Sequence, residues 1–91
     1  MEAQRWRGAG GEIDLILRDV NTLVFVEVKK SRSFARAAER ISPRQIARIL
    51  NAAEEFLAGE PAGQLTDIRF DAALVDATGA IEIRQNAFGQ G

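Results

Sequence analysis

The chain has 91 residues and a mass of 10.0 kDa, enough for one small domain. Its composition, 46% apolar and 27% charged, is that of an ordinary globular protein. The absence of cysteine and histidine excludes disulfides, zinc sites built on thiolates or imidazoles, and nucleophilic chemistry that needs a histidine base. The lack of cysteine predicts a cytoplasmic protein, and no apolar run approaches the ~20 residues of a membrane span. Any chemistry would therefore depend on carboxylates, lysines and a hard cation.

Positive charge is concentrated between Lys29 and Arg48. This segment carries seven basic residues and one acid, Glu39, so its net charge is +6 while the rest of the chain sums to -7. Such a segment is typical of a surface that binds a polyanion, and equally of a solvated helix face. If it binds nucleic acid, the expected contact residues are Lys30, Arg32, Arg36, Arg40, Arg44 and Arg48.

In chain order, residues 8–11 form a glycine-rich, flexible entry, and two strands follow. Residues 12–18 alternate in polarity, residues 19–22 have turn chemistry, and residues 23–30 are rich in β-branched and aromatic side chains. This pattern predicts an antiparallel hairpin. A register in which paired positions sum to 41 places Ile13, Leu15 and Leu17 opposite Val28, Val26 and Val24, which gives one wholly apolar face. The same register sets Asp14 opposite Glu27, Glu12 opposite Lys29 and Ile16 opposite Phe25.

Residues 31–41 are ambiguous, because their apolar spacing suits either a mobile loop or a single helical turn. Ser42 and Pro43 then predict the start of a helix that continues to about Ala58. Its expected apolar stripe consists of Ile46, Ile49, Leu50, Ala53 and Leu57. Strands are expected within residues 66–76 and over 80–84, and a fraying tail over 86–91. The order β-β-α-β-β predicts a single α/β domain over residues 1–91, with a mixed sheet packed on a helix.

Three residues of the hairpin form the pattern D-(x)n-E-x-K. Asp14 and Glu27 would converge at the open end of the hairpin, and Lys29 returns to the face of Glu27 because side chains alternate along a strand. Two carboxylates can hold Mg²⁺ or Mn²⁺, and a lysine beside them can orient a water or stabilise charge on a phosphate. The alternative from spacing alone is a surface ladder of charges that includes Glu12 and Lys29. Directly opposed like charges, however, are destabilising unless something compensates them.

Five segments carry a family resemblance: GEIDLI, LVFVEVK, PRQIARI, RFDAALV and IRQNAF. Over residues 5–88 the chain resembles the YraN-type family of small bacterial proteins, which is similar to Holliday-junction resolvases and other PD-(D/E)xK nucleases. The resemblance implies a restriction-endonuclease-like fold, a mixed central β-sheet with flanking helices. It also implies that Asp14 and Glu27 are metal ligands and Lys29 the catalytic lysine. The family's N-terminal helix, which carries a further active-site glutamate in the resolvases, is missing from this sequence, and Glu2 cannot be assigned that role.

Two functions follow from these observations. The first is a Mg²⁺-dependent endonuclease-like protein that acts on DNA phosphodiesters, including branched DNA, and the second is a non-catalytic domain that binds nucleic acid or protein. Without the family's helix, an apolar sheet face would be exposed, so we expect a homodimer. Outside the hairpin, we expect Gln45 to be solvated rather than part of the site, Asp71 to pair with an arginine, and Trp6 to pack in the core rather than stack on a base.

Overall fold

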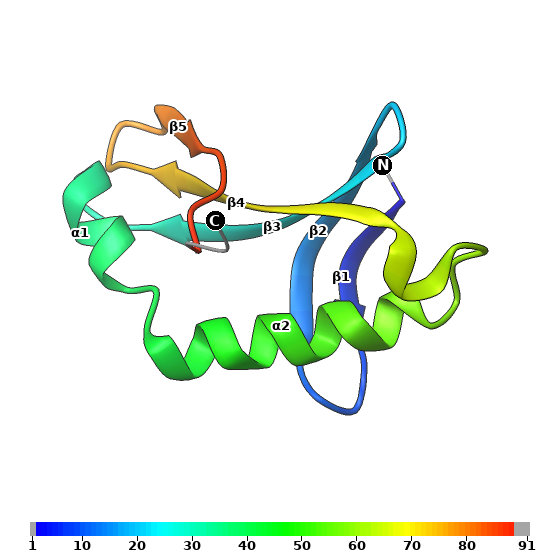
Figure 1. Cartoon of the computed structure of the whole chain (residues 1–91). Helices are drawn as coiled ribbons and strands as arrows, with labels where there is room; N and C mark the ends of the chain where they lie inside the picture. Colours follow the sequence, from blue (N-terminus) through cyan, green and yellow to red (C-terminus); the bar gives the residue numbers. More distant parts are fainter. Residues whose placement is uncertain (1, 89–91) are drawn as a thin grey trace.

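The structure is a computed structural model that describes residues 2–88. Its elements are β1 (Ala3–Arg7), β2 (Glu12–Asp19), β3 (Thr22–Lys30), α1 (Phe34–Glu39), α2 (Pro43–Leu57), a 3-10 turn (Gly63–Leu65), β4 (Asp67–Val75) and β5 (Ile81–Arg84). The strands form one five-stranded sheet in the order β1-β2-β3-β4-β5 (Figure 1). Only β3 and β4 are parallel, and α2 lies in the crossover between them. The predicted α/β architecture with a mixed sheet and a flanking helix is confirmed.

Strand β1 was not expected, because AQRWR has little of the alternation that marked the other strands. It pairs antiparallel with β2, and Trp6 lies opposite Ile13. The indole of Trp6 packs edge-on against Phe56 of α2, with ring centroids 5.6 Å apart, which confirms its expected place in the core. The glycine-rich residues 8–11 are thus the turn between two strands rather than a flexible entry.

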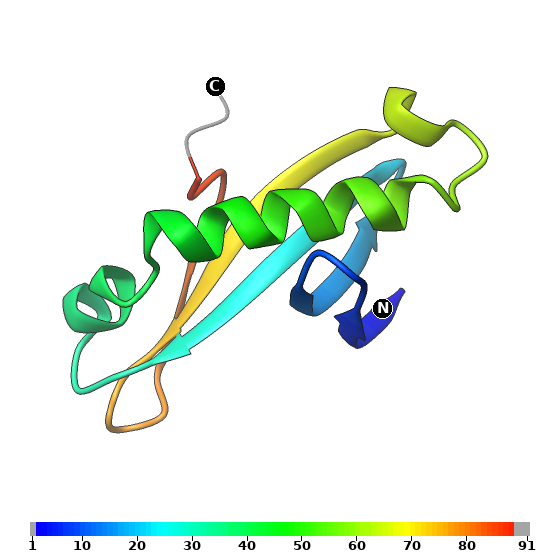
Figure 2. The same ribbon diagram turned by 90° about the horizontal axis from the view of Figure 1, so that it is seen from below.

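Helix α2 begins as the sequence predicted. The Ser42 hydroxyl accepts the Gln45 backbone N–H at 3.1 Å, and Pro43 is the first helical residue. The residues that α2 buries are Ile49, Ala52, Ala53 and Leu57, and they meet a sheet face whose largest buried side chains include Ile13, Ile16, Leu23 and Phe25. Figure 2 shows α2 running along the length of this face.

Residues 34–39 of the ambiguous segment form α1, a short helix. The Ser33 hydroxyl caps it by accepting the Arg36 backbone N–H at 3.2 Å. Ala37 packs against Ala72 and Leu74 of β4, so α1 lies on the same sheet face as α2. Neither helix in the described part of the chain is long and apolar enough to cross a membrane.

The opposite face of the sheet, which we call the outer face, carries no helix within residues 2–88 (Figure 1). Its apolar side chains come from four strands: Leu15, Leu17, Val24, Val26, Val28, Ala73, Val75, Ile81 and Ile83. Val24 and Val26 are buried among their neighbours, whereas Val28, Ile81 and Ile83 are exposed. The predicted exposed apolar sheet face is therefore present.

The C-terminal residues differ from the expected fraying tail. The Ala87 backbone N–H donates to the Phe70 carbonyl at 2.9 Å, and the Phe88 ring lies 5.9 Å from the Phe70 ring in the core. The prediction is wrong for residues 86–88, because a single aromatic residue suffices to anchor the segment. Residues 89–91 lie outside the described part of the chain.

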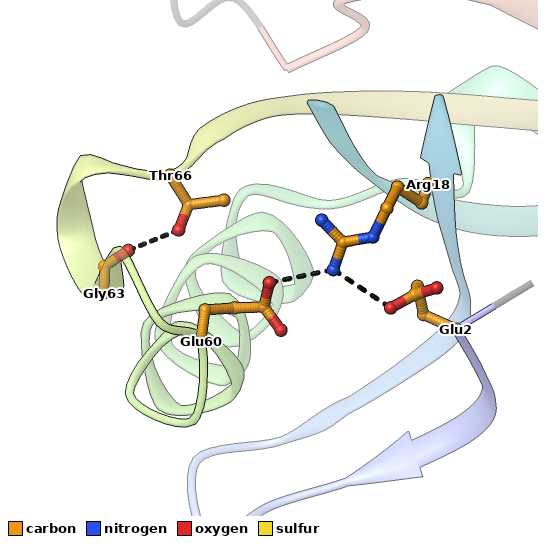
Figure 3. A network of polar contacts seen from close by, with 5 residues as sticks. All are labelled: Glu2, Arg18, Glu60, Gly63 and Thr66. Atoms are coloured by element: carbon orange, nitrogen blue, oxygen red, sulfur yellow. Dashed lines mark hydrogen bonds and ion pairs between the residues drawn. The ribbon is translucent and has the colours of Figure 1, made fainter. Parts of the chain in front are cut away.

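Arg18 ties the far end of β2 to the end of α2. Its guanidinium lies 3.0 Å from the Glu2 carboxylate and 2.8 Å from that of Glu60 (Figure 3). The Glu2 carboxylate is therefore paired with Arg18, at the end of β2 that lies away from Asp14. This agrees with the expectation that Glu2 is not part of the candidate site.

Candidate functional site

The β2–β3 hairpin has one regular end and one open end. Its ladder runs from Asp19–Thr22 at the turn to Leu15–Val26, in the predicted register. Asp14 and Glu27 are the next residues on the two strands, just beyond the last pair. There β3 continues beside β4 through Lys30. The site thus lies where β2 leaves β3.

Beyond the Leu15–Val26 pair, the carboxylate of Asp14 accepts a hydrogen bond from the backbone of β3, where a regular ladder would use a backbone carbonyl of β2. Its Oδ2 accepts the Val28 backbone N–H at 2.8 Å. The expected pairs Asp14–Glu27, Ile13–Val28 and Glu12–Lys29 are absent from the ladder, and this part of the register prediction is wrong.

The side chain of Ile13 shows the same irregularity. Ile13 is buried with Ile16 and Phe25 under α2 instead of joining Leu15 on the outer face. The predicted wholly apolar face therefore includes Leu15 and Leu17 but not Ile13. Glu12 lies 3.2 Å from Arg7 on β1, not beside Lys29.

Glu27 is one of two buried acidic residues in the described chain, with 5% of its surface exposed. Burial and, after it, the neighbouring Asp14 carboxylate raise the pKa of Glu27 to about 8, while Lys29 acts in the opposite direction. The buried position of Glu27 and the neighbouring Asp14 carboxylate both disfavour ionisation of Glu27. The pair is therefore suited to a cation that neutralises it.

Lys29 lies on the same side of β3 as Glu27, as the two-residue spacing predicts. Its Nζ is 3.5 Å from Oε2 of Glu27, and its side chain is 24% exposed. The ammonium is thus held beside the carboxylate pair and still reaches solvent, where a substrate would approach.

Gln45 also reaches the site, contrary to the sequence-based expectation. Its Nε2 donates a hydrogen bond to Oε2 of Glu27. The cap at Ser42 fixes the first turn of α2 over the open end of the hairpin, and so directs this amide inward. Nothing in the spacing of a polar residue in a first helical turn distinguishes this placement from a solvated one.

The donor set fits Mg²⁺ or Mn²⁺ with a coordination shell completed by other ligands. Within residues 2–88 no three or more acidic side chains lie close enough to share a metal ion. At this site the available protein ligands are therefore the carboxylates of Asp14 and Glu27. Mg²⁺ is commonly held by one or two carboxylates, together with waters and substrate phosphates. Asp14 and Glu27 therefore fit a divalent ion whose remaining ligands are waters and a phosphate of the substrate.

The basic segment extends from the site across the helical side of the molecule. All six predicted contact residues are exposed: Lys30, Arg32, Arg36, Arg40, Arg44 and Arg48. They come from the end of β3, from α1 and its flanks, and from the first half of α2. Arg40 donates to the Lys30 carbonyl at 3.3 Å, which holds the end of α1 against β3.

Asp71 behaves as the sequence predicted. Its carboxylate accepts two hydrogen bonds from Arg69, at 2.9 and 3.0 Å, and a third from the Asn86 backbone N–H at 3.3 Å. It is a structural carboxylate on the outer face.

Comparison with known proteins places these residues in a family. The family model described as "Uncharacterised protein family UPF0102" matches residues 1–75. A UPF0102 protein of Roseobacter denitrificans is 64% identical over 90 residues, which cover 99% of this chain and 70% of that protein. UPF0102 proteins of Cereibacter sphaeroides and Ruegeria pomeroyi are 66% and 64% identical, and the matches cover 94% and 97% of this chain and 74% and 72% of those proteins.

Proposed function

The chain belongs to the uncharacterised protein family UPF0102, which confirms the resemblance to YraN-type proteins, and we propose that it is a Mg²⁺-dependent endonuclease-like protein acting on DNA. One observation carries the proposal: a buried Glu27 lies beside Asp14, with Lys29 at 3.5 Å, at the point where two strands part. A charged cluster of this kind weakens a small domain unless a ligand uses it.

Each residue has a distinct role in this proposal. Asp14 and Glu27 would hold Mg²⁺ or Mn²⁺, which supplies Lewis acidity toward a phosphoryl oxygen and lowers the pKa of a bound water. The Lys29 ammonium lies where it can orient the attacking water and stabilise negative charge on the phosphate. Gln45 holds the Glu27 side chain in place through its hydrogen bond.

The architecture supports the finer assignment to a restriction-endonuclease-like fold. The mixed sheet, the crossover helix α2 on one face and the carboxylates at the divergence of β2 and β3 agree with what the family resemblance implies. The exposed basic segment beside the site supports DNA as the partner, and branched DNA is the substrate that the resemblance favours. With no cysteine in the sequence, the cytoplasm remains the expected compartment.

We also propose that the protein forms a homodimer through the outer face. Val28, Ile81 and Ile83 are 37%, 64% and 55% exposed on an apolar sheet surface. Adjacent exposed apolar side chains of this kind favour association. Replacing Ile83 with lysine should make the protein monomeric, and light scattering at high concentration measures this. A monomeric parent protein would contradict the proposal.

A non-catalytic nucleic-acid-binding domain is the second candidate. The observation that favours it is the small donor set, because only two carboxylates gather in the described chain. Both candidates predict DNA binding by the basic segment, whereas only the first predicts cleavage that depends on Asp14, Glu27 and Lys29.

A cleavage assay separates the two. Branched and linear DNA would be incubated with the protein and Mn²⁺ or Mg²⁺, in parallel with Asp14→Asn, Glu27→Gln and Lys29→Ala. We expect each variant to lose at least ~100-fold in rate, since general acid–base and electrostatic contributions of single groups are of this size. Asp67→Asn, which removes an exposed charge at the start of β4, is the matched control. DNA binding without cleavage by the parent protein would support the second candidate.

A further inference from the structure

A polar pocket of about 500 Å³ adjoins the carboxylate pair. Its walls are the turn of residues 8–11 and the first half of α2, and its polar side chains include Arg7, Glu12, Gln45 and Arg48. Gln45 belongs to both places, because it lines this pocket and donates to Glu27. Gln45 therefore connects the pocket with the candidate site.

The turn that forms one wall is fixed to α2 by close contacts. A Cβ added at Gly11 would lie 3.0 Å from the Arg48 carbonyl oxygen, and one at Gly10 would lie 3.2 Å from the Asn51 Cβ. The backbone N–H groups of Ala9 and Gly10 donate to the Glu55 carboxylate at 3.0 and 3.3 Å. The wall thus has a defined shape, and glycine permits its close approach to the helix.

The side chains that line the pocket carry a net charge of +1, from Arg7, Arg48 and Glu12. The nearby Glu55 carboxylate is occupied by the backbone N–H groups of Ala9 and Gly10. Arg7 lies 3.2 Å from Glu12, so these two charges largely offset each other. Arg48 is exposed, and no acidic side chain within residues 2–88 lies within ion-pair distance of it. A guanidinium beside an amide donor matches the geometry of a phosphate group, which accepts several hydrogen bonds at once.

We propose that this pocket binds a backbone phosphate of the DNA strand, next to the reacting phosphate at the proposed metal site of Asp14 and Glu27. The proposal rests on the proposed function and names the position of the substrate beyond the reacting bond. Arg48 supplies the main charge, Gln45 connects the two phosphate positions, and the turn of residues 8–11 forms one wall.

The first test is DNA binding without metal. Fluorescence anisotropy of a labelled duplex in EDTA, at a series of NaCl concentrations, would compare the parent protein with Arg48→Ala. A lost phosphate contact should reduce the slope of log affinity against log salt by about 0.9. The control, Arg84→Ala on β5, removes the same charge far from the pocket and should leave the slope unchanged. Equal slopes for Arg48→Ala and the parent protein would overturn the proposal.

The second test separates a shaped pocket from a charged helix face. Gly11→Ala changes no charge but forces the turn away from the Arg48 carbonyl, so it should lower affinity at least ~3-fold in a variant whose circular dichroism shows that it is folded. Full affinity in Gly11→Ala would show that the pocket's shape plays no part. In a methylphosphonate scan, single phosphates of the duplex are neutralised in turn. Neutralising one of them should lower the DNA affinity of the parent protein and leave the affinity of Arg48→Ala unchanged. Because these assays contain EDTA, absence of cleavage with metal would count against the proposed function and leave this result intact.

Discussion

Glu27 and Asp71 are the two buried acids of the described chain, and they lie on neighbouring strands in opposite surroundings. Asp71, 3% exposed, has a guanidinium aligned with both of its oxygens and a backbone N–H besides. Glu27, 5% exposed, has a second carboxylate as its neighbour, one amide donor and one ammonium at 3.5 Å. Burial alone therefore does not identify a functional carboxylate. A buried carboxylate whose charge is not fully balanced by neighbouring donors and cations is the better indicator.

The difference has a structural cause. Arg69 and Asp71 are two residues apart on β4, so the pleat places them on one face and the pair forms within a single strand. Asp14 and Glu27 come from two strands that separate at that point, which brings two acids together without a matching base for each. The first arrangement stabilises the sheet, and the second leaves a place for a cation.

Of the substitutions, removing the compensated acid has the largest expected effect. Asp71→Asn should lower the free energy of unfolding by about 2 kcal/mol, since the buried side chain loses its two charge-assisted hydrogen bonds from Arg69, while Asp19, 3.8 Å from Arg69, still partly compensates the guanidinium. Glu27→Gln should leave stability unchanged or raise it, because at pH 7 the folded protein must hold the buried Glu27 carboxyl protonated, and glutamine is neutral without that cost. Urea unfolding at pH 7 measures both. Equal losses in the two variants would remove the distinction between the two acids.

A second effect is expected from pH. The pKa of Glu27 is about 8 in the folded protein and 4.5 in its ordinary state, so between these values the folded protein binds the extra proton. The free energy of unfolding should therefore fall as pH rises from about 5 to 8, by at most ~1.4 kcal/mol per pH unit, and then level off. The sequence contains no histidine, whose side chain would titrate in the same pH range. Glu27→Gln should flatten the profile, and an equally sloped profile in that variant would assign the effect to another group.

The smallest effect concerns Gln45. Gln45→Ala removes the amide donor to Glu27 and should cost about 1 kcal/mol of unfolding free energy, the usual size for one hydrogen bond. The loss should be greater at pH 9 than at pH 6, because the ionised carboxylate gains more from the donor. Arg44→Ala, in the same helical turn, is the control for helix propensity. A pH-independent loss would mean that Gln45 acts only through packing.

Much of this site could be predicted from the sequence because strand spacing fixes which residues share a face. The positions of Glu27 and Lys29 followed from the pleat, and the pairs from Leu15–Val26 to the turn followed from burying one apolar face. The departure of β2 at Asp14 could not be predicted, since the regular ladder and the observed structure both place Asp14 near Glu27. They differ in where Ile13 is buried and in the partner of Glu12. The inward direction of Gln45 depends on how α2 crosses the sheet, which no local pattern encodes.

The fold shows the same division. The start of helix α2 and its apolar stripe can be predicted from its own residues. Strand β1, in contrast, depends on contacts with residues far away in the sequence. Trp6 packs on Phe56, and Glu55 holds the turn that follows β1. An element stabilised mainly by such tertiary contacts has little pattern of its own.

The central claim is that Asp14 and Glu27 together bind a divalent cation, and a thermal melt with added metal tests it most directly. At pH 8, Mg²⁺ or Mn²⁺ at ten times its Kd should stabilise the parent protein by about 1.4 kcal/mol, a rise in Tm of roughly 6–11 °C. NaCl at equal ionic strength should not reproduce the rise, and Lys29→Ala should retain it. Asp14→Asn should melt slightly higher without metal and show no response to it. A metal response in Asp14→Asn equal to that of the parent protein would contradict the account, because the ion would then bind elsewhere.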